Sequence, residues 1–145
     1  MNDRKLSIVI PAYNDENNIF VLFEALGDVL QRELPTYTYE IIFVDDGSQD
    51  ETWKRIHEIA TKYPHVKGLT LSRNFGQQAA LTAGMSHATG QAIITMDSDF
   101  QDPPAVIPEM IKKWENGNRI VYGRRKFRSD PLLKRFTADL YYRML

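Results

Sequence analysis

Two aspartates that stand two residues apart, Asp97 and Asp99, are the first feature of this sequence that could carry chemistry. In an extended segment, residues two apart point to the same side, so the two carboxylates would lie close together. Their repulsion would disfavour the charged form of at least one of them unless a cation lay between them, and oxygen ligands of this kind suit Mg²⁺ or Mn²⁺. The alternative is that both side chains cap the following turn and bind nothing. Because the pair follows an apolar, strand-like segment directly, we favour the metal site.

A second acidic pair, Asp45 and Asp46, is followed by Gly47 and Ser48. We expect one carboxylate of this pair to contact a ligand, and Asp46 could accept hydrogen bonds from a nucleobase or a ribose. Gly47 would let the backbone turn with a positive φ. The alternative is a capped turn into a helix, with a capping box that runs from Ser48 to Glu51.

Three further side chains, Tyr13, Arg73 and Arg125, follow other strand-like segments. Tyr13 could stack on a base, or it could pack as an ordinary aromatic over a strand end. The two arginines could pair bidentately with phosphates, or they could be ordinary surface residues. Together with the acidic pairs, these residues indicate a site for a phosphorylated ligand.

Several other kinds of site are excluded or disfavoured. The chain has no cysteine, which excludes a disulfide scaffold, a cysteine-zinc site and a thiol nucleophile. There is no Gly-x-Gly-x-x-Gly pattern after the first strand-like segment and no Walker loop, so Rossmann dehydrogenases and P-loop enzymes fit poorly. No Ser-His-Asp order suggests acyl transfer. The formal net charge of −1 argues against bulk nucleic-acid binding.

Short apolar segments rich in β-branched residues alternate with segments of helical periodicity. Strands are expected at residues 6–10, 40–44, 66–71, 92–96 and 120–122. Helices are expected between them, and Asp102 and Pro103 are expected at the N-cap and first position of the last one. This alternation predicts one α/β domain with a doubly wound, mostly parallel sheet and helices on both faces. Ligands bind such sheets beyond the carboxyl ends of the strands, which is where the residues discussed above stand.

Four segments taken together resemble the family 2 glycosyltransferases of the GT-A fold. They are residues 10–14, 44–48, 72–76 and 96–104, in this order and spacing. The Ser-Arg-Asn-Phe-Gly and Gln-Asp-Pro-Pro motifs resemble one branch in particular. This branch comprises the polyprenyl-phosphate glycosyltransferases, related to dolichol-phosphate mannose synthase and the bacterial bactoprenol glucosyltransferases. The resemblance implies an inverting enzyme that moves a sugar from a UDP- or GDP-linked donor to a polyprenyl phosphate.

The resemblance assigns one group of residues to the nucleotide. Pro11, Tyr13 and Asp15 would line the base pocket, although the family more often has Glu where this chain has Asp15. Asp46 would contact the base or the ribose. Asp97 would lie near both the ribose and the metal.

A second group would serve the metal and the phosphates. The resemblance makes Asp99 and Gln101 the ligands of Mg²⁺ or Mn²⁺, with Asp97 beside them. Arg125 would face the diphosphate or the acceptor phosphate, so that Asp99 and Arg125 are the expected catalytic residues. Arg73 is expected to add a further contact to the nucleotide.

The resemblance also divides the chain into two parts. Residues 1–125 would form a nucleotide-sugar-binding catalytic domain. Residues 126–145 are basic and amphipathic, and would begin a helix at the membrane interface that receives the lipid acceptor. The alternative is a helix that packs on the domain's own sheet. No run approaches the roughly 20 apolar residues of a membrane span, so we expect this chain to be soluble by itself and the full-length protein to work at the cytoplasmic face of the cell membrane.

Other functions stay open at this stage. A family 2 transferase can act on a glycan hydroxyl, which needs a general base, whereas a lipid phosphate with a second pKa of about 6 is already mostly a dianion at pH 7. A nucleotidyltransferase shares the α/β plan and needs carboxylate-bound Mg²⁺, but it usually opens with a Gly-rich, basic loop that residues 11–14 do not provide. A non-catalytic nucleotide-binding module is the remaining alternative.

Overall fold

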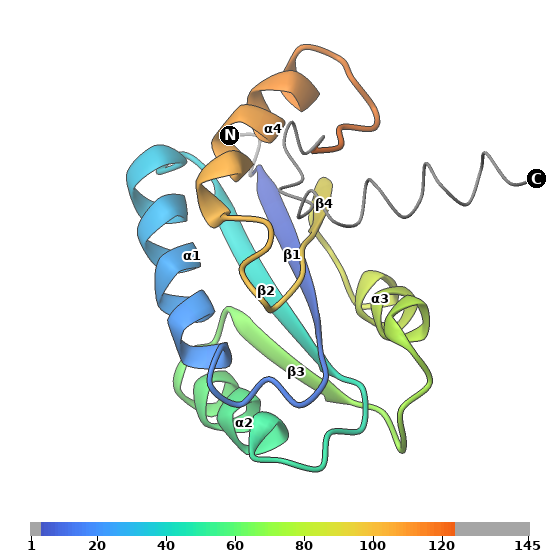
Figure 1. Cartoon of the computed structure of the whole chain (residues 1–145). Helices are drawn as coiled ribbons and strands as arrows, with labels where there is room; N and C mark the ends of the chain where they lie inside the picture. Colours follow the sequence, from blue (N-terminus) through green and yellow to red (C-terminus); the bar gives the residue numbers. More distant parts are fainter. Residues whose placement is uncertain (1–3, 124–145) are drawn as a thin grey trace, which may run out of the picture.

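Four parallel strands form a sheet in the computed structural model, which describes residues 4–123. Strands and helices alternate along the chain, as the sequence predicts (Figure 1). In chain order the elements are β1 (Lys5–Ala12), α1 (Ile19–Glu33), β2 (Thr38–Asp45), α2 (Thr52–Lys62), β3 (Val66–Thr70), α3 (Gln77–Ser86), β4 (Ala92–Thr95), the 3₁₀ turn η1 (Pro104–Val106) and α4 (Ile107–Glu115).

The strand order, β3-β2-β1-β4, places β1 inside the sheet. Strand β1 pairs with β2 along its whole length, and its residues 6–9 pair with the whole of β4, so that Ile8 lies opposite both Ile41 and Ile94. The chain builds outward from β1 to β3 and then returns to the other side of β1. The sheet therefore has its topological switch point between β1 and β4, where doubly wound sheets bind ligands.

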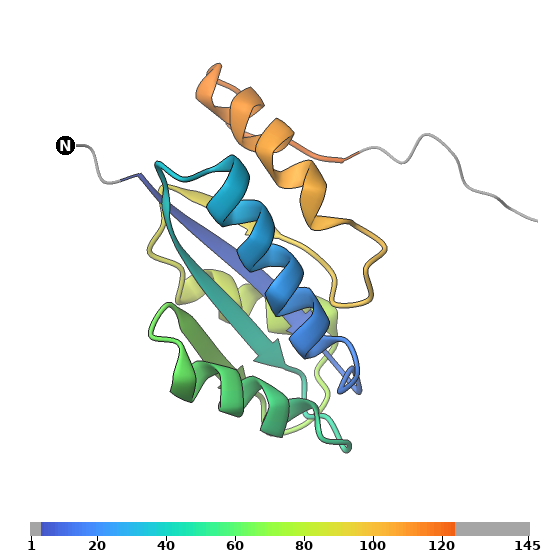
Figure 2. The ribbon, with the colours of Figure 1, turned by 90° about the vertical axis from the view of Figure 1, so that its left-hand side faces the viewer.

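Helices cover both faces of the sheet, as expected from the sequence. Helices α1, α2 and α4 lie on one face and α3 lies on the other (Figures 1 and 2). Alternate residues of β1 serve the two layers, since Ile8 belongs to the larger apolar cluster and Val9 to the cluster under α3. Helix α3 sits very close to the sheet at Gly84, where a Cβ would lie 2.4 Å from the Cγ1 of Val9.

The structure corrects three local predictions. Residues 120–122 form no strand, and the side chains of Ile120 and Tyr122 are 86% and 80% exposed. Apolar, β-branched composition gives a strand only where a neighbouring strand pairs with it, and within residues 4–123 β4 pairs with β1 alone. The other two corrections concern helix starts.

Asp102 is not the N-cap of α4, and Ser48 and Glu51 do not form a capping box. The two prolines after Asp102 lead into the tight turn η1 first, and α4 begins only at Ile107. At α2, Asp50 accepts the hydrogen bond from the Thr52 N–H at 3.0 Å, while the Ser48 hydroxyl accepts one from the Asn14 N–H at 2.9 Å. Instead of capping α2, Ser48 thus joins the loop after β2 to the loop after β1.

No helix within residues 4–123 is long and apolar enough to cross a lipid bilayer.

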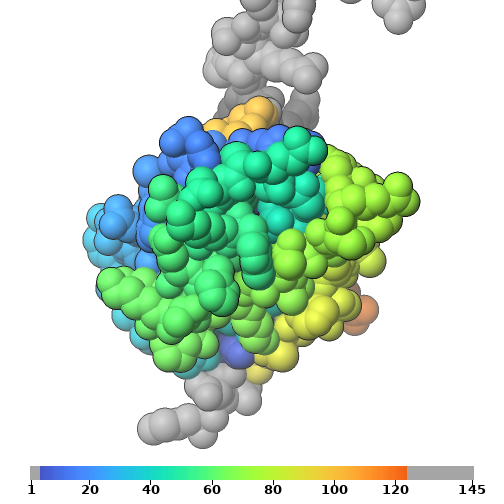
Figure 3. Space-filling view, turned by 90° about the horizontal axis from the view of Figure 1, so that it is seen from below, coloured from blue at the N-terminus to red at the C-terminus, as the bar shows by residue number. Residues whose placement is uncertain are grey.

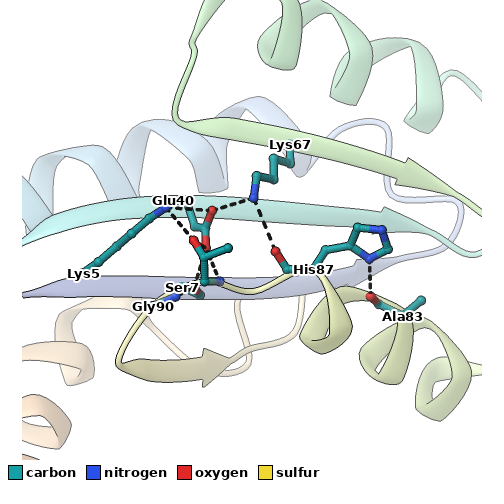
Figure 4. Close-up of polar contacts among 8 residues, drawn as sticks. Lys5, Ser7, Glu40, Lys67, Ala83, His87 and Gly90 are labelled. Carbon is teal, nitrogen blue, oxygen red and sulfur yellow. Dashed lines mark hydrogen bonds and ion pairs between the residues drawn. The ribbon is translucent and has the colours of Figure 1, made fainter.

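A buried carboxylate in β2, Glu40, joins the amino-terminal halves of β1, β2 and β3 to the segment that precedes β4 (Figure 4). It accepts hydrogen bonds from the Ser7 hydroxyl at 2.6 Å and from the Thr89 N–H and hydroxyl at 2.7 and 2.8 Å. Lys5 and Lys67 form ion pairs with it at 3.2 and 2.8 Å. Burial by itself would raise the pKa of Glu40, but the bonds from Lys67, Ser7 and Thr89 outweigh it and hold that pKa well below its usual range.

We predict that Glu40→Gln lowers the free energy of unfolding by about 3 kcal/mol at pH 7, because it breaks a buried, charge-paired network. Since the folded-state pKa is depressed, the carboxylate stabilises the fold fully above its unfolded pKa of about 4.3, and this contribution declines below that pH. Urea unfolding of the wild type and the variant at pH 7, 5 and 3 measures the difference in their free energies of unfolding. This difference should become smaller only at pH 3. A difference that stays constant down to pH 3 would contradict this role of Glu40. As a control, Glu58→Gln, at an exposed residue, should change the free energy of unfolding by less than about 0.5 kcal/mol at all three pH values.

Candidate functional site

A cavity of about 490 Å³ opens at the carboxyl edge of the sheet. Figure 3 views the molecule from this end, where surface from the segments after β1 (blue), β2 (teal) and β3 (yellow-green) lies side by side. All four strand-end loops contribute to the walls. The lining residues are Pro11, Ala12, Tyr13, Asp15, Asp46, Asn74, Gly76, Gln77, Asp97, Ser98, Asp99 and Gln101.

The cavity brings together most of the site residues that the sequence singled out. Seven of them line it, namely Pro11, Tyr13, Asp15, Asp46, Asp97, Asp99 and Gln101. Arg73 is not in the lining, and its guanidinium carbon lies instead 4.7 Å from the centre of the Phe75 ring. Arg125 lies outside the residues that the structure describes.

Each carboxylate oxygen of Asp46 accepts a hydrogen bond from the backbone of the loop after β3. Buried at 3% exposure, Asp46 accepts the Phe75 N–H at 2.8 Å and the Gly76 N–H at 2.9 Å. These bonds fasten the loop after β3 to the end of β2, and a carboxylate still has lone pairs with which to meet a ligand. Its neighbour Asp45 accepts bonds from the Ser48 N–H and the Thr70 hydroxyl and does not line the cavity. Of the two, Asp46 is therefore the aspartate at the site.

Gly47 presses the loop after β2 against the loop after β3. Its φ of +70° confirms the left-handed turn predicted from the sequence. A Cβ at this position would lie 2.4 Å from the carbonyl carbon of Arg73, closer than atoms can approach. The backbone of the cavity wall is thus fixed by a glycine and by the two bonds to Asp46.

The loop after β4 is held from both sides. The Ser98 hydroxyl, 5% exposed as a residue, donates to the carboxylate of Asp15 and so joins this loop to the end of β1. Gln77, at the start of α3, donates from Nε2 to Asp97 Oδ1 at 2.5 Å. Further along, Phe100 has a φ of +60°, a strained conformation for a residue with a side chain, and such strain is common at functional sites.

Sequence reasoning missed Ser98 and Gln77. For Ser98 a signal existed, since a residue between two outward-facing aspartates of an extended segment points inward. For Gln77 there was none, because only the packing of α3 on the sheet brings the amide to Asp97.

Four carboxylates line the cavity, from Asp15, Asp46, Asp97 and Asp99, and the described part of the lining contains no Lys, Arg or His. A diphosphate would meet only like charge at such a wall, so its binding there calls for a cation. Within residues 4–123 no cluster of three or more His, Cys, Asp or Glu side chains could hold a metal alone. Mg²⁺ typically takes one or two carboxylates from a protein and fills its other positions with phosphate oxygens and water. The donor set therefore fits a metal that binds together with a diphosphate.

Gln101 faces Asp99 with its donor end. Its backbone N–H donates to Asp99 Oδ1 at 3.0 Å and its Nε2 to Asp99 Oδ2 at 2.5 Å. The family resemblance implies contact of a metal with the amide oxygen of Gln101, and such contact would require this amide group to rotate by about half a turn.

We predict that Asp46→Asn lowers the free energy of unfolding by about 2 kcal/mol, because the two backbone N–H groups bind different carboxylate oxygens and one of them would then face the NH₂ group of the amide. Asp99→Asn should change it by less than about 0.5 kcal/mol, because Asp99 is exposed. Urea unfolding at pH 7 without ligand measures both. Equal losses in the two variants would contradict the role of Asp46 as the anchor of the loop.

The chain matches known proteins over nearly its whole length. The family model described as "Glycosyl transferase family 2" matches residues 7–144. An uncharacterized glycosyltransferase of Synechocystis is 44% identical over 142 residues, which are 97% of this chain and 44% of that protein. A prophage bactoprenol glucosyl transferase homolog of Escherichia coli is 43% identical over 141 residues, 97% of this chain and 45% of that protein. The chain thus spans less than half the length of these curated relatives.

Among solved structures, the fold is similar to that of a mannosyltransferase from Pyrobaculum calidifontis determined in complex with GDP-Man and Mn²⁺. The TM-score is 0.64 at 19% sequence identity, over 77% of this chain and 32% of that one. At this identity the likeness shows a common fold.

Proposed function

Because the chain belongs to the family 2 glycosyltransferases and has their GT-A fold, we propose that it is the nucleotide-sugar-binding part of an inverting, metal-dependent glycosyltransferase. Its acceptor is a polyprenyl phosphate and its donor is a UDP- or GDP-linked sugar. The observation that carries the proposal is the cavity at the strand ends, where Asp97 and Asp99 lie with Asp46 and Tyr13. The bactoprenol glucosyl transferase relatives, similar over 97% of the chain, support the choice of acceptor.

The nucleoside would occupy the side of the cavity formed by β1 and β2. Tyr13 is 42% exposed and offers a ring face for the base, next to Pro11 and Asp15. The Asp46 carboxylate lies at the end of β2, held in place by its two backbone bonds, and would accept from the base or the ribose. Since the loops that carry these groups are already bonded to one another, little ordering would accompany binding.

The diphosphate would lie toward Asp97, Asp99 and Gln101. A bound Mg²⁺ or Mn²⁺ would neutralise the charge that develops on the leaving diphosphate. Asp97 and Asp99 would hold the ion at the strand end, and we assign Arg73 and Arg125 to phosphate contacts outside the described cavity wall. A lipid phosphate is already a nucleophilic dianion at neutral pH, so its attack needs no general base from the chain.

The proposal extends to the two parts of the chain. Residues 1–125 would bind the donor, and the basic segment 126–145 would lie on the membrane surface and receive the acceptor. This arrangement would place the reaction at the cytoplasmic face of the membrane.

We predict that UDP or GDP together with Mn²⁺ raises the melting temperature of the chain by about 5–10 °C at a hundredfold excess over Kd. Asp99→Ala should abolish the rise, because the metal loses a carboxylate ligand. Differential scanning fluorimetry measures both, with Asp28→Ala on the exposed side of α1 as the matched control that keeps the full rise. Equal stabilisation of Asp99→Ala and the wild type would remove Asp99 as a ligand.

We also predict sugar transfer to a lipid phosphate. Membranes from cells that express the gene encoding this chain, given radiolabelled UDP- or GDP-sugar and a short polyprenyl phosphate, should yield a labelled, organic-soluble product. The same membranes with Asp99→Ala should yield at least about a hundredfold less, because charge stabilisation on the leaving group is lost. Label found only in free glycans would contradict the lipid acceptor and favour a hydroxyl acceptor.

A further inference from the structure

The side chain of Gln77 contacts Asp97 although the two residues belong to different parts of the fold. Gln77 is the first residue of α3, whereas Asp97 lies just beyond the end of β4. The Nε2 of Gln77 donates to Asp97 Oδ1 at 2.5 Å. Both side chains line the cavity. A neutral amide orients a carboxylate without cancelling its charge, whereas a Lys or Arg at this position would compete with a bound cation.

The position of Gln77 is itself firmly set. The two residues before it donate their N–H groups to Asp46, at 2.8 and 2.9 Å, and Gly76 turns the chain into the helix with a φ of +95°. At the other end of α3, Gly84 packs directly against Val9 and Val44. The amide therefore reaches Asp97 from a helix that is fastened to the sheet at both ends.

We propose that Gln77 is a positioning residue, whose amide holds the Asp97 carboxylate in the orientation that binds the metal and diphosphate. This inference rests on the function proposed above. Because the two residues before Gln77 bond to Asp46, Gln77 also links the nucleoside side of the cavity to the diphosphate side. Groups that orient a metal-binding carboxylate through a hydrogen bond typically change metal affinity 10–100-fold when they are removed.

The test compares two neighbouring glutamines. Gln77→Met keeps the length of the side chain and removes the donor, while Gln78→Met makes the same change at an exposed residue that does not line the cavity. Mn²⁺ is titrated into the chain at a saturating, fixed concentration of UDP or GDP, and the melting temperature is followed. Gln77→Met should need at least about tenfold more Mn²⁺ for half of the full stabilisation, and Gln78→Met should match the wild type.

The outcomes separate a positioning role from a structural one. With positioning, excess Mn²⁺ restores the full melting temperature of Gln77→Met, and its melting temperature without ligand equals that of the wild type. A lowered melting temperature without ligand that excess Mn²⁺ does not restore would overturn the proposal, as would a titration curve identical to that of the wild type. If Asp99→Ala loses the stabilisation and Gln77→Met does not, only this inference fails. If the wild type shows no stabilisation by nucleotide and Mn²⁺, the proposed function fails with it.

Discussion

Strand β1 pairs in parallel with β2 on one side and β4 on the other, and this pairing decides which loops meet at the site. Because the strands are parallel, their carboxyl ends share one edge, and because β4 returns to the far side of β1, the loops after β1 and β4 lie next to each other at that edge, where Ser98 bonds to Asp15. The side chains that pack β1 between two helical layers, such as Ile8 and Val9, thus also place Asp15 beside the loop that contains Asp97 and Asp99.

Some carboxylates within residues 4–123 hold the fold together, and others line the cavity. Glu40 joins the strands at the amino end of the sheet, and Asp45 closes the turn after β2. Asp46 belongs to both groups, since its backbone bonds build the cavity wall that it also lines. Asp99 bonds only within its own loop among the contacts described above, and it is exposed, as a residue that meets a soluble ligand must be.

The sequence predicted the strands, the helical layers and the residues at the strand ends, because these follow from local periodicity and from the rule that parallel strands end at one edge. The apolar run of β1 indicated a strand buried on both faces, and Gly47 indicated a left-handed turn. Predictions from local sequence patterns were wrong or missing where the structure depends on contacts with residues far away in the sequence. Residues 120–122 have strand-like composition without a partner strand, and Gln77 meets Asp97 only through the packing of α3. The roles of the lining residues toward nucleotide and metal stay predictions.

Paramagnetic broadening by Mn²⁺ tests the central claim most directly, since it reports which residues lie near the ion. With UDP or GDP bound, small additions of Mn²⁺ should broaden the amide NMR signals of Asp97, Asp99 and Gln77 first. The signals of Glu40 and Thr89, which lie toward the amino ends of the strands, should stay sharp. Broadening that begins around Glu40, or that is the same with and without nucleotide throughout residues 4–123, would contradict a metal–diphosphate site at the strand ends.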